Sequence, residues 1–278
     1  MDLDTYRQAS RQTWDEMSAG WEERRDWLIE MTGSVNAWIV DQVDPQPGQT
    51  ILDIAAGTGD LGFAAAERVG AGGRVITTDF APDMLEAARR NGDARGLSNV
   101  EYQVMDAERM PLGDDSVDGV VCRFGYMLMA DPSAALKETR RVLREGGTLG
   151  FAVWQTPDRN LWAAIPAMTL VQRGHVPPPE PGAPGIFALG DRARLEEVVT
   201  GAGFDVSRIE EIAFEWRYGA GEVWDTLNKL AGPIAAAIKE LSAQEQQETR
   251  EAIEAAMEEF RDGDDLVVPA ATWGVVAS

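Results

Sequence analysis

Short apolar runs alternate with amphipathic segments between residue 50 and about residue 154. Runs of apolar and β-branched residues are typical of strands that are buried on both faces of a sheet. Apolar residues that recur every three or four positions are typical of the helices that cover such a sheet. The pattern predicts an α/β fold with a parallel sheet and helices on both faces. We expect strands at 50–54, 74–79, 100–105, 119–123 and 148–154, and helices at 60–69, 82–95 and 132–144.

The segment before this region is also helical in its pattern. Residues 5–42 carry aromatic and apolar residues at broadly helical spacing, which predicts two or three short helices. We expect the breaks at Gly20 and at Thr32-Gly33-Ser34, with Ser34 as the N-cap of the following helix.

The pattern changes after residue 155. A helical stretch at 161–172 leads into the proline- and glycine-rich residues 174–185, which favour a mobile loop or lid. Asp191 is placed to cap a helix that ends near Ala202. A strand follows at 204–216, then acidic helices at 221–260, and a last strand at 266–277 that we expect to pair antiparallel with the strand before it.

These elements suggest four parts of the chain. Residues 1–44 form an N-terminal helical cap, and residues 45–154 form the core of the sheet. Residues 155–190 form a lid or substrate loop, and residues 191–278 complete the sheet with its last two strands, with a helical insertion at about 221–260.

Charge and composition exclude several classes of function. The 278 residues are 44% hydrophobic and carry a formal net charge of -22, which disfavours binding to nucleic acids or to anionic membranes. The chain has one cysteine, Cys122, and one histidine, so a zinc or redox-metal site is not expected. The N-terminal residues lack a signal-peptide pattern and no apolar run is long enough to span a bilayer. We therefore expect a cytoplasmic protein; a homodimer is compatible with the sequence.

A small-residue turn follows the first strand of the core. Asp53 lies in that strand, and Gly57 and Gly59 allow the backbone to approach a ligand closely. Asp79 ends the next strand, where a carboxylate can accept hydrogen bonds from both hydroxyl groups of a ribose. A phosphate-binding G-x-G-x-x-G pattern is missing, and the acidic Asp60 would repel a pyrophosphate. The pattern favours a nucleoside ligand without phosphates over a dinucleotide.

Two further strands end in residues that suit the same ligand. Asp106-Ala107 follows the third strand, and a short acid there can accept a hydrogen bond from an exocyclic amine of a base. Arg123-Phe124-Gly125 ends the fourth strand and places a cation and an aromatic ring at the carboxyl edge of the sheet.

These motifs resemble those of a known family. The chain carries, in order, Ile-Leu-Asp-Ile-Ala-Ala-Gly-Thr-Gly-Asp, Ile-Thr-Thr-Asp-Phe-Ala-Pro-Asp-Met-Leu, Asn-Val-Glu-Tyr-Gln-Val-Met-Asp-Ala-Glu-Arg-Met-Pro and Ala-Leu-Lys-Glu-Thr-Arg-Arg-Val-Leu-Arg-Glu-Gly-Gly. It resembles the class I S-adenosylmethionine-dependent methyltransferases, and most of all the branch that includes the ubiquinone and menaquinone C-methyltransferases. The resemblance covers roughly residues 45–155. It implies a Rossmann-like, doubly wound, seven-stranded sheet with an antiparallel last strand, and S-adenosylmethionine as cofactor with S-adenosylhomocysteine as product.

The resemblance also implies a role for each matching residue. The turn from Asp53 to Gly59 would hold the amino-acid end of the cofactor, and Asp79 would hold its ribose. Phe80, Met84, Asp106 and Ala107 would contact the adenine, and Arg123 and Phe124 would lie near the transferable methyl group. The implied cofactor residues are Asp53, Ala55, Gly57, Thr58, Gly59, Asp79, Phe80, Met84, Asp106, Ala107, Arg123 and Phe124.

The chain departs from the family pattern in two places. Ala55 replaces the first glycine of the turn, which a methyl side chain tolerates if φ is negative there. After Phe124-Gly125 the quinone enzymes usually carry Arg-Asn, whereas this chain has Tyr126-Met-Leu-Met129. The acceptor need not be a quinone precursor.

Aromatic and thioether residues outside the sheet are candidates for an acceptor pocket, because they offer large apolar surfaces. His175, in the proline-rich loop, is the candidate general base if a closing lid brings it to the site. We expect methyl transfer to oxygen or carbon of a small, largely apolar or aromatic acceptor. The alternatives are a non-catalytic cofactor-binding regulator, a dinucleotide-dependent oxidoreductase, and a protein or RNA methyltransferase. The pocket candidates are Trp14, Trp21, Tyr126, Met127, Met129, Trp162, Met168, Trp216 and Trp224.

Overall fold

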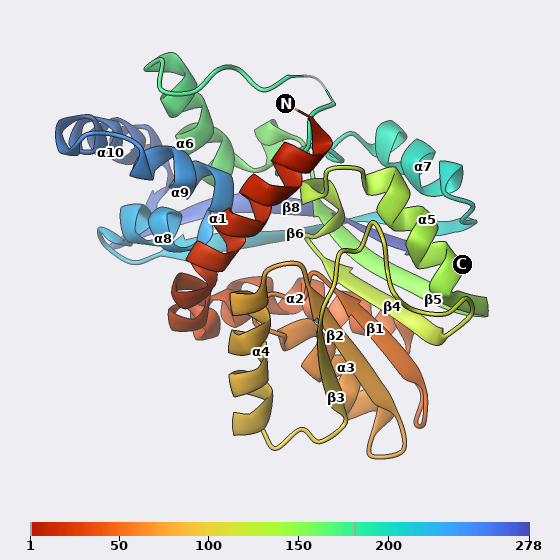
Figure 1. Ribbon diagram of the computed structural model, residues 1–278. Helices are drawn as coiled ribbons and strands as arrows, with labels where there is room; N and C mark the ends of the chain where they lie inside the picture. The colour runs from red at the N-terminus through yellow and green to blue at the C-terminus, as the bar shows by residue number, and fades with distance from the viewer. Residues whose placement is uncertain (1, 181) are drawn as a thin grey trace.

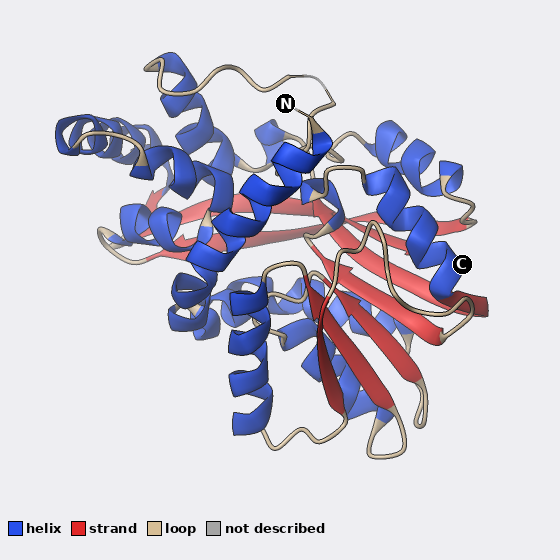
Figure 2. Cartoon of the chain, in the orientation of Figure 1, coloured by secondary structure: helices blue, strands red, loops and turns tan. Residues whose placement is uncertain are grey.

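A twisted sheet forms the centre of the molecule in the computed structural model, which describes residues 2–180 and 182–278 (Figures 1 and 2). Seven strands lie in the order β3-β2-β1-β4-β5-β8-β6, and the two-residue strand β7 pairs with β8. Strand β8 is antiparallel to both of its neighbours, whereas the pairs formed by β1 to β5 are parallel. This arrangement confirms the predicted fold class. The strands are β1 (Thr50–Ile54), β2 (Arg74–Asp79), β3 (Val100–Val104), β4 (Val117–Arg123), β5 (Leu143–Trp154), β6 (Val206–Tyr218), β7 (Arg261–Asp262) and β8 (Asp265–Ala277).

Helices cover both faces of this sheet. Helices α2 and α3 pack on one face, with α4 beside α3, while α5 and α7 pack on the other. Helices α6, α8, α9 and α10 gather beyond the ends of β6 and β8, and α1 crosses in front of them (Figure 1). The helices are α1 (Leu3–Glu23), α2 (Arg25–Val43), α3 (Asp60–Val69), α4 (Pro82–Ala94), α5 (Pro132–Val142), α6 (Leu161–Gln172), α7 (Arg192–Gly201), α8 (Glu222–Leu230), α9 (Gly232–Lys239) and α10 (Ala243–Met257).

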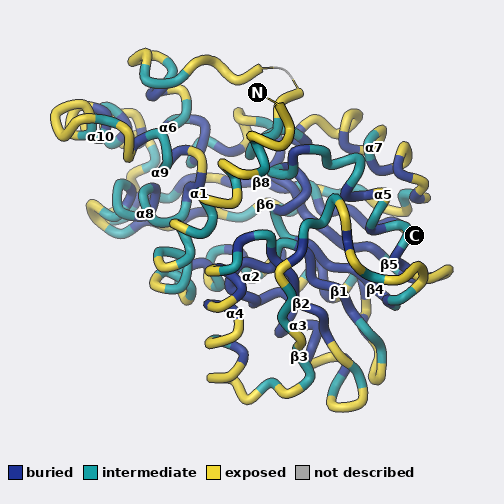
Figure 3. Tube along the Cα trace, viewed as in Figure 1, coloured by how far each residue is buried: buried dark blue, intermediate teal, exposed yellow. Residues whose placement is uncertain are grey.

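Side chains that alternate between the two faces of the sheet divide the core into two clusters. Ile51 of β1 and Val75 of β2 face α2 and α3, whereas their neighbours Leu52 and Ile76 belong to the cluster on the opposite face. Successive side chains in a strand point to opposite faces, so strands that are apolar at every position must be covered on both. Figure 3 shows β1, β2, β4 and β5 buried along most of their length, whereas β3 and β6 at the edges of the sheet are more exposed. The continuous apolar runs in the sequence therefore arise because helices cover both faces of the sheet.

Two long helices replace the short N-terminal helices that we expected. Gly20 lies inside α1, and Gly33 and Ser34 lie inside α2; the chain breaks at Arg24. A Cβ atom on Gly20 would lie 2.6 Å from the backbone oxygen of Lys229 in α8. This glycine therefore allows α1 to pack closely on α8 and does not end a helix. The predicted end of the helix at 144 was also wrong. Helix α5 ends at Val142, because the following residues enter β5 through a shift in strand register.

The predicted helix cap at Asp191 is confirmed. The side chain of Asp191 accepts a hydrogen bond from the backbone of Arg194 and caps α7. Within residues 2–180 and 182–278, no helix combines the length and apolarity that a bilayer crossing requires. The described residues also contain no cluster of three or more His, Cys, Asp or Glu side chains suited to a metal ion.

The packing of α1 on α8 can be tested with a matched pair of glycine substitutions. We expect Gly20→Ala to lower the free energy of unfolding by about 1–3 kcal/mol, because its methyl group collides with the backbone of α8. Gly33→Ala is the control, since a Cβ there meets nothing within 4 Å. It should raise the free energy of unfolding by up to about 1 kcal/mol through helix propensity. Urea denaturation measures both, and equal effects of the two substitutions would contradict the close packing.

Candidate functional site

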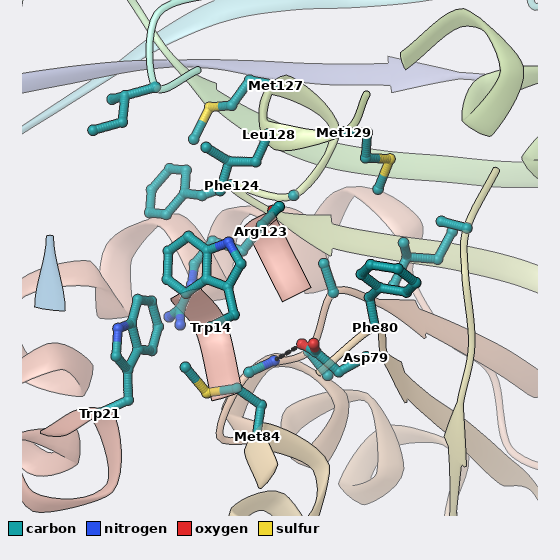
Figure 4. A pocket seen from close by; sticks show the side chains of 18 of the residues that line it. Trp14, Trp21, Asp79, Phe80, Met84, Arg123, Phe124, Met127, Leu128 and Met129 are labelled. Carbon is teal, nitrogen blue, oxygen red and sulfur yellow. Dashed lines mark hydrogen bonds between the residues drawn. The ribbon is translucent and has the colours of Figure 1, made fainter. Parts of the chain in front are cut away.

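A pocket lies at the carboxyl ends of β1, β2 and β4 (Figure 4). The sheet provides one wall, α1 provides the cover, and residues of the β5, β6 and α8–α9 region provide the far wall. The lining thus extends from the turns at the edge of the sheet to aromatic residues on the far side.

Asp79 ties together the turns that follow β1 and β2. Its two carboxylate oxygens accept hydrogen bonds from the backbone N–H groups of Gly57 and Ala81, both at 2.9 Å. Burial raises the pKa of Asp79 to about 6, although these N–H groups favour the charged form. The carboxylate lines the pocket with acceptor capacity left over, because each oxygen has a second lone pair.

Asp53 lies beneath the same turn. Its carboxyl group is fully buried and has no hydrogen-bond partner among the described residues. Burial raises its pKa well above the usual value, and the positive charge of Arg123 opposes part of that shift. A Cβ atom on Gly62 would lie 2.4 Å from one carboxylate oxygen, so the first turn of α3 seals this group. Asp53 supports the turn from below.

Asp60 does not act as the repulsive charge that we expected. Its carboxylate forms salt bridges with Arg25 of α2 and, at 3.4 Å, with Arg95. The side chain is buried among these cations, so its negative charge is largely balanced. The missing G-x-G-x-x-G pattern is therefore the remaining feature that disfavours a phosphate-containing ligand.

Two non-glycine residues of the pocket have a left-handed backbone. Ala55 has a φ of 53°, which contradicts the negative φ that we expected for an alanine in place of the family's glycine. Phe124 has a φ of 61°, which is rare for a bulky side chain and costs about 1–3 kcal/mol. Its ring stacks on Trp154 with 4.1 Å between the ring centroids. The two turns that face the pocket from β1 and β4 are both strained.

Helix α1 covers the pocket; the sequence interpretation named Trp14 and Trp21 of this helix as pocket candidates but missed Tyr6 and Ser10. Tyr6, Ser10, Trp14 and Trp21 all line it from one face of this helix (Figure 4 labels the two tryptophans). The hydroxyl group of Tyr6 donates to the backbone oxygen of Leu128 at 3.0 Å. Their spacing in the sequence, with intervals of four and seven residues, is the signal that could have revealed this face.

A wall of aromatic rings closes the other side of the pocket. Trp154 packs against Trp162 with 4.9 Å between ring centroids, and Trp162 packs against Trp216 at 5.2 Å. We refer to Phe124, Trp154, Trp162 and Trp216 as the aromatic wall. Trp154 was missing from the predicted pocket because it was assigned to the strand. Its position as the last residue of β5 brings it to the carboxyl edge.

The pocket brings together most of the predicted site residues. Ten of the twelve predicted cofactor residues line it, and the exceptions are Thr58 and Gly59. Tyr126 lies in the core and its hydroxyl group pairs with that of Thr139, so it does not reach the pocket. Met168, Trp224 and His175 also lie outside the lining, and the structure does not bring His175 to the site. The predicted residues found in the lining are Trp14, Trp21, Asp53, Ala55, Gly57, Asp79, Phe80, Met84, Asp106, Ala107, Arg123, Phe124, Met127, Met129, Trp162 and Trp216.

Comparison with known proteins identifies the family. Residues 32–159 match the model of the ubiE/COQ5 methyltransferase family. The ubiquinone/menaquinone biosynthesis C-methyltransferase UbiE of Shewanella frigidimarina is 31% identical over 170 residues, which cover 58% of this chain and 68% of that protein. The chain belongs to the ubiE/COQ5 methyltransferase family. Membership agrees with the predicted resemblance to the S-adenosylmethionine-dependent methyltransferases.

Other relatives show how far the likeness extends. The demethylmenaquinone methyltransferase of Thermus thermophilus is 39% identical over 126 residues, which cover 45% of this chain and 56% of that protein. A crystal structure of a putative methyltransferase from Bacillus halodurans shares the fold, with a TM-score of 0.61 and 20% identity over 87% of this chain and 97% of that one. The chain spans between 38% and 68% of the length of the curated relatives that it matches.

The residues of the pocket fit the cofactor of this family. The left-handed Gly57 leaves its backbone N–H beside Asp79, and a Cβ there would lie 3.6 Å from the ring of Trp21. Trp21 therefore packs closely over this turn. Phe80 and the buried Met84 offer apolar surfaces for a base, and Asp106 offers carboxylate oxygens near its edge. The individual roles of these residues stay predictions.

The role of Asp79 in cofactor binding can be tested by substitution. We expect Asp79→Ala to weaken the binding of S-adenosylhomocysteine by about 1–3 kcal/mol, because the ribose hydroxyl groups lose their acceptor. Isothermal titration calorimetry measures the change. Asp118→Ala is a control, because that carboxylate lies near the amino end of the sheet and outside the pocket. Unchanged binding in Asp79→Ala would remove the assignment.

The raised pKa of Asp79 predicts two opposite effects of pH. The folded chain, with a pKa of about 6, binds more protons than an unfolded chain, whose Asp pKa is about 3.9. The contribution of Asp79 to the free energy of unfolding therefore increases as the pH falls from about 7 to about 5. Binding of S-adenosylhomocysteine should weaken about tenfold over the same range, because the protonated group accepts fewer hydrogen bonds.

Asp79→Asn separates this titration from that of other acids. Between about pH 5 and about pH 7, the variant should lose the part of both pH trends that comes from the titration of Asp79. Thermal denaturation and calorimetry at the two pH values provide the readouts. Equal affinity of the wild-type protein at both would show that the carboxylate is not an acceptor for the cofactor.

Proposed function

We propose that this protein transfers a methyl group from S-adenosylmethionine to oxygen or carbon of a small, largely apolar or aromatic acceptor. The supporting observation is the continuity of one pocket. The turns around Asp53, Asp79 and Asp106 lie on one side of it, and the aromatic wall lies on the other. When bound, the cofactor supplies a methyl group on a positively charged sulfur, which is already a good leaving group.

The chain itself has three tasks in this reaction. It must hold the acceptor at the methyl group, keep the two in line, and exclude water. Phe124 and Trp154 form a rigid stacked surface on which a flat acceptor can lie. Helix α1 closes the opposite side with Trp14 and Trp21. Both features favour an apolar ring system over a sugar or a peptide.

The predicted loop at 174–185 borders the acceptor side of this pocket. The backbone N–H of Gly185 donates to the backbone oxygen of Met127 at 3.0 Å, and Ile186 lines the pocket. Pro181 lies outside the described residues. These contacts support a role for the loop in closing over the acceptor.

The lining of the pocket favours a wider class of acceptors than quinone precursors alone. The two named relatives carry quinone-biosynthesis names, which makes a demethylated quinol one candidate. Met127, Leu128 and Met129, which stand where the quinone enzymes usually carry Arg-Asn, all line the pocket. We therefore include phenols, enols and carboxylic acids of ring compounds.

A mass-spectrometric screen tests the proposal. Quinols, naphthols, aromatic acids and polyketide-like compounds are incubated with the protein and S-adenosylmethionine. We expect at least one acceptor to gain the mass of one methylene unit, with stoichiometric S-adenosylhomocysteine. A Phe124→Ala variant should lose at least about tenfold in kcat/KM, because the stacked surface is removed. Tight cofactor binding without turnover of any acceptor would favour the regulatory alternative. A co-purifying nicotinamide or flavin would revive the oxidoreductase.

A further inference from the structure

We propose that the acceptor is an aromatic carboxylic acid, that Arg123 binds its carboxylate beside the aromatic wall, and that the product is a methyl ester. This inference rests on the proposed methyl transfer and specifies its substrate class. Two independent features of the pocket lead to it. One is a partly free cation in the lining, and the other is the lack of an available base.

Arg123 is held in place through only one of its nitrogen atoms. Its Nη1 donates to the hydroxyl oxygen of Thr32 at 2.8 Å and to the side-chain oxygen of Asn36 at 3.0 Å, both on α2. No acceptor among the described residues pairs with its Nε or Nη2. Figure 4 shows the side chain reaching from the end of β4 toward Trp14 and Trp21. The free Nε–H and Nη2–H form the planar fork that binds a carboxylate through both oxygens.

The charge of Arg123 has no direct counter-charge in the described part of the chain. Its two partners, Thr32 and Asn36, are neutral, and no described carboxylate lies within salt-bridge distance of it. Asp60, on the same side of the sheet, is already paired with Arg25 and Arg95. Arg123 is partly buried, and its unused donors can form charge-assisted hydrogen bonds with an anion in the pocket. The pocket is therefore prepared for a negatively charged group.

The carboxylates of the pocket are not available to remove a proton from an acceptor. Glu108 is paired with Arg7 and also accepts a hydrogen bond from the backbone of Asp131. Asp106 accepts a hydrogen bond from the backbone of Glu108. The carboxyl oxygens of Asp53 are sealed beneath the turn. Asp79 lies on the cofactor side with its backbone partners.

The remaining titratable side chains are equally unsuited to act as a base. The hydroxyl group of Tyr6 donates to a backbone oxygen, and burial raises its pKa to about 12. His175 does not line the pocket. An acceptor that arrives as an anion needs no base, so it suits a pocket whose carboxylates have these other contacts.

A carboxylate satisfies both requirements in a balanced reaction. One of its oxygens donates an electron pair to the methyl carbon, and a new C–O bond forms. The bond between that carbon and sulfur breaks, its electron pair stays on sulfur, and the sulfonium becomes a neutral thioether. No proton moves. Arg123 is in this scheme a specificity-determining residue, which orients the carboxylate while Phe124 and Trp154 hold the ring.

Binding of matched ligands to the protein loaded with S-adenosylhomocysteine tests the anion site directly. The probes are 1-naphthoate, methyl 1-naphthoate and 1-naphthol, measured by calorimetry at about pH 7.5. We expect 1-naphthoate to bind at least about tenfold more tightly than its methyl ester, as a charge-assisted bidentate pair implies. Arg123→Met should abolish this preference and leave ester binding unchanged. Arg123→Lys should retain part of it, because the charge remains and the fork is lost.

Two controls separate a binding role from a structural one. Arg74→Met makes the same chemical change at an exposed position at the start of β2, and it should keep the preference for 1-naphthoate. An unchanged thermal unfolding temperature in Arg123→Lys shows that the fold is intact. In turnover, the acceptor KM for 1-naphthoate should rise in this variant much more than kcat falls. The wild-type kcat should be flat between about pH 7 and about pH 9, since no base is used.

Each outcome decides between the two proposals. Equal binding of acid and ester, or a preference that persists in both Arg123 variants, overturns the inference. Methylation of 1-naphthol without methylation of 1-naphthoate also overturns it and leaves the proposed function standing. Arg123-dependent binding of the acid without methylation of any acceptor overturns the proposed function, while the anion site remains.

Discussion

The site depends on the hydrogen bonds that join the turns after β1 and β2. The backbone N–H of Gly57 donates to Asp79, and the N–H of Ala56 donates to the backbone oxygen of Thr78, both at 2.9 Å. Parallel strands by themselves fix only the positions of their ends. These two bonds fix the shape of the turn between β1 and α3, and that shape places Gly57 against Trp21. The carboxylate that gives the turn its shape is also the one left facing the ligand.

A second constraint acts at the end of β4. The left-handed backbone of Phe124 is unfavourable, but it lets the ring stack on Trp154, and its N–H still donates to the backbone oxygen of Ala152. Residues in such conformations persist only where the surroundings determine them, and they concentrate at functional sites. Because Arg123 precedes Phe124, the same turn directs the cation and the ring into one cavity.

The sheet could be predicted from the sequence because its strands are buried on both faces and therefore read as continuous apolar runs. The motif residues Asp53, Asp79 and Asp106 could be predicted for a related reason, since each stands at or near the carboxyl end of a strand. A helical cap with Trp14 and Trp21 as pocket residues was predicted, but the place where α1 packs could not be. Its contacts with α8 and α9 join residues about 200 positions apart in the chain, and no local pattern reports such contacts. The positive φ of Ala55 was missed because propensity favours the opposite sign.

Helix α1 has one property that distinguishes it from the other long helices. None of its residues is fully buried, and neither core cluster contains a buried residue from it. Its attachment includes exposed ion pairs such as Glu22 with Arg90 and Glu23 with Lys229, at 2.6 Å and 2.7 Å. Surface pairs of this kind are weak and are screened by salt. Part of the attachment of α1 therefore depends on ionic strength, and charged residues on this helix influence how firmly the pocket is covered.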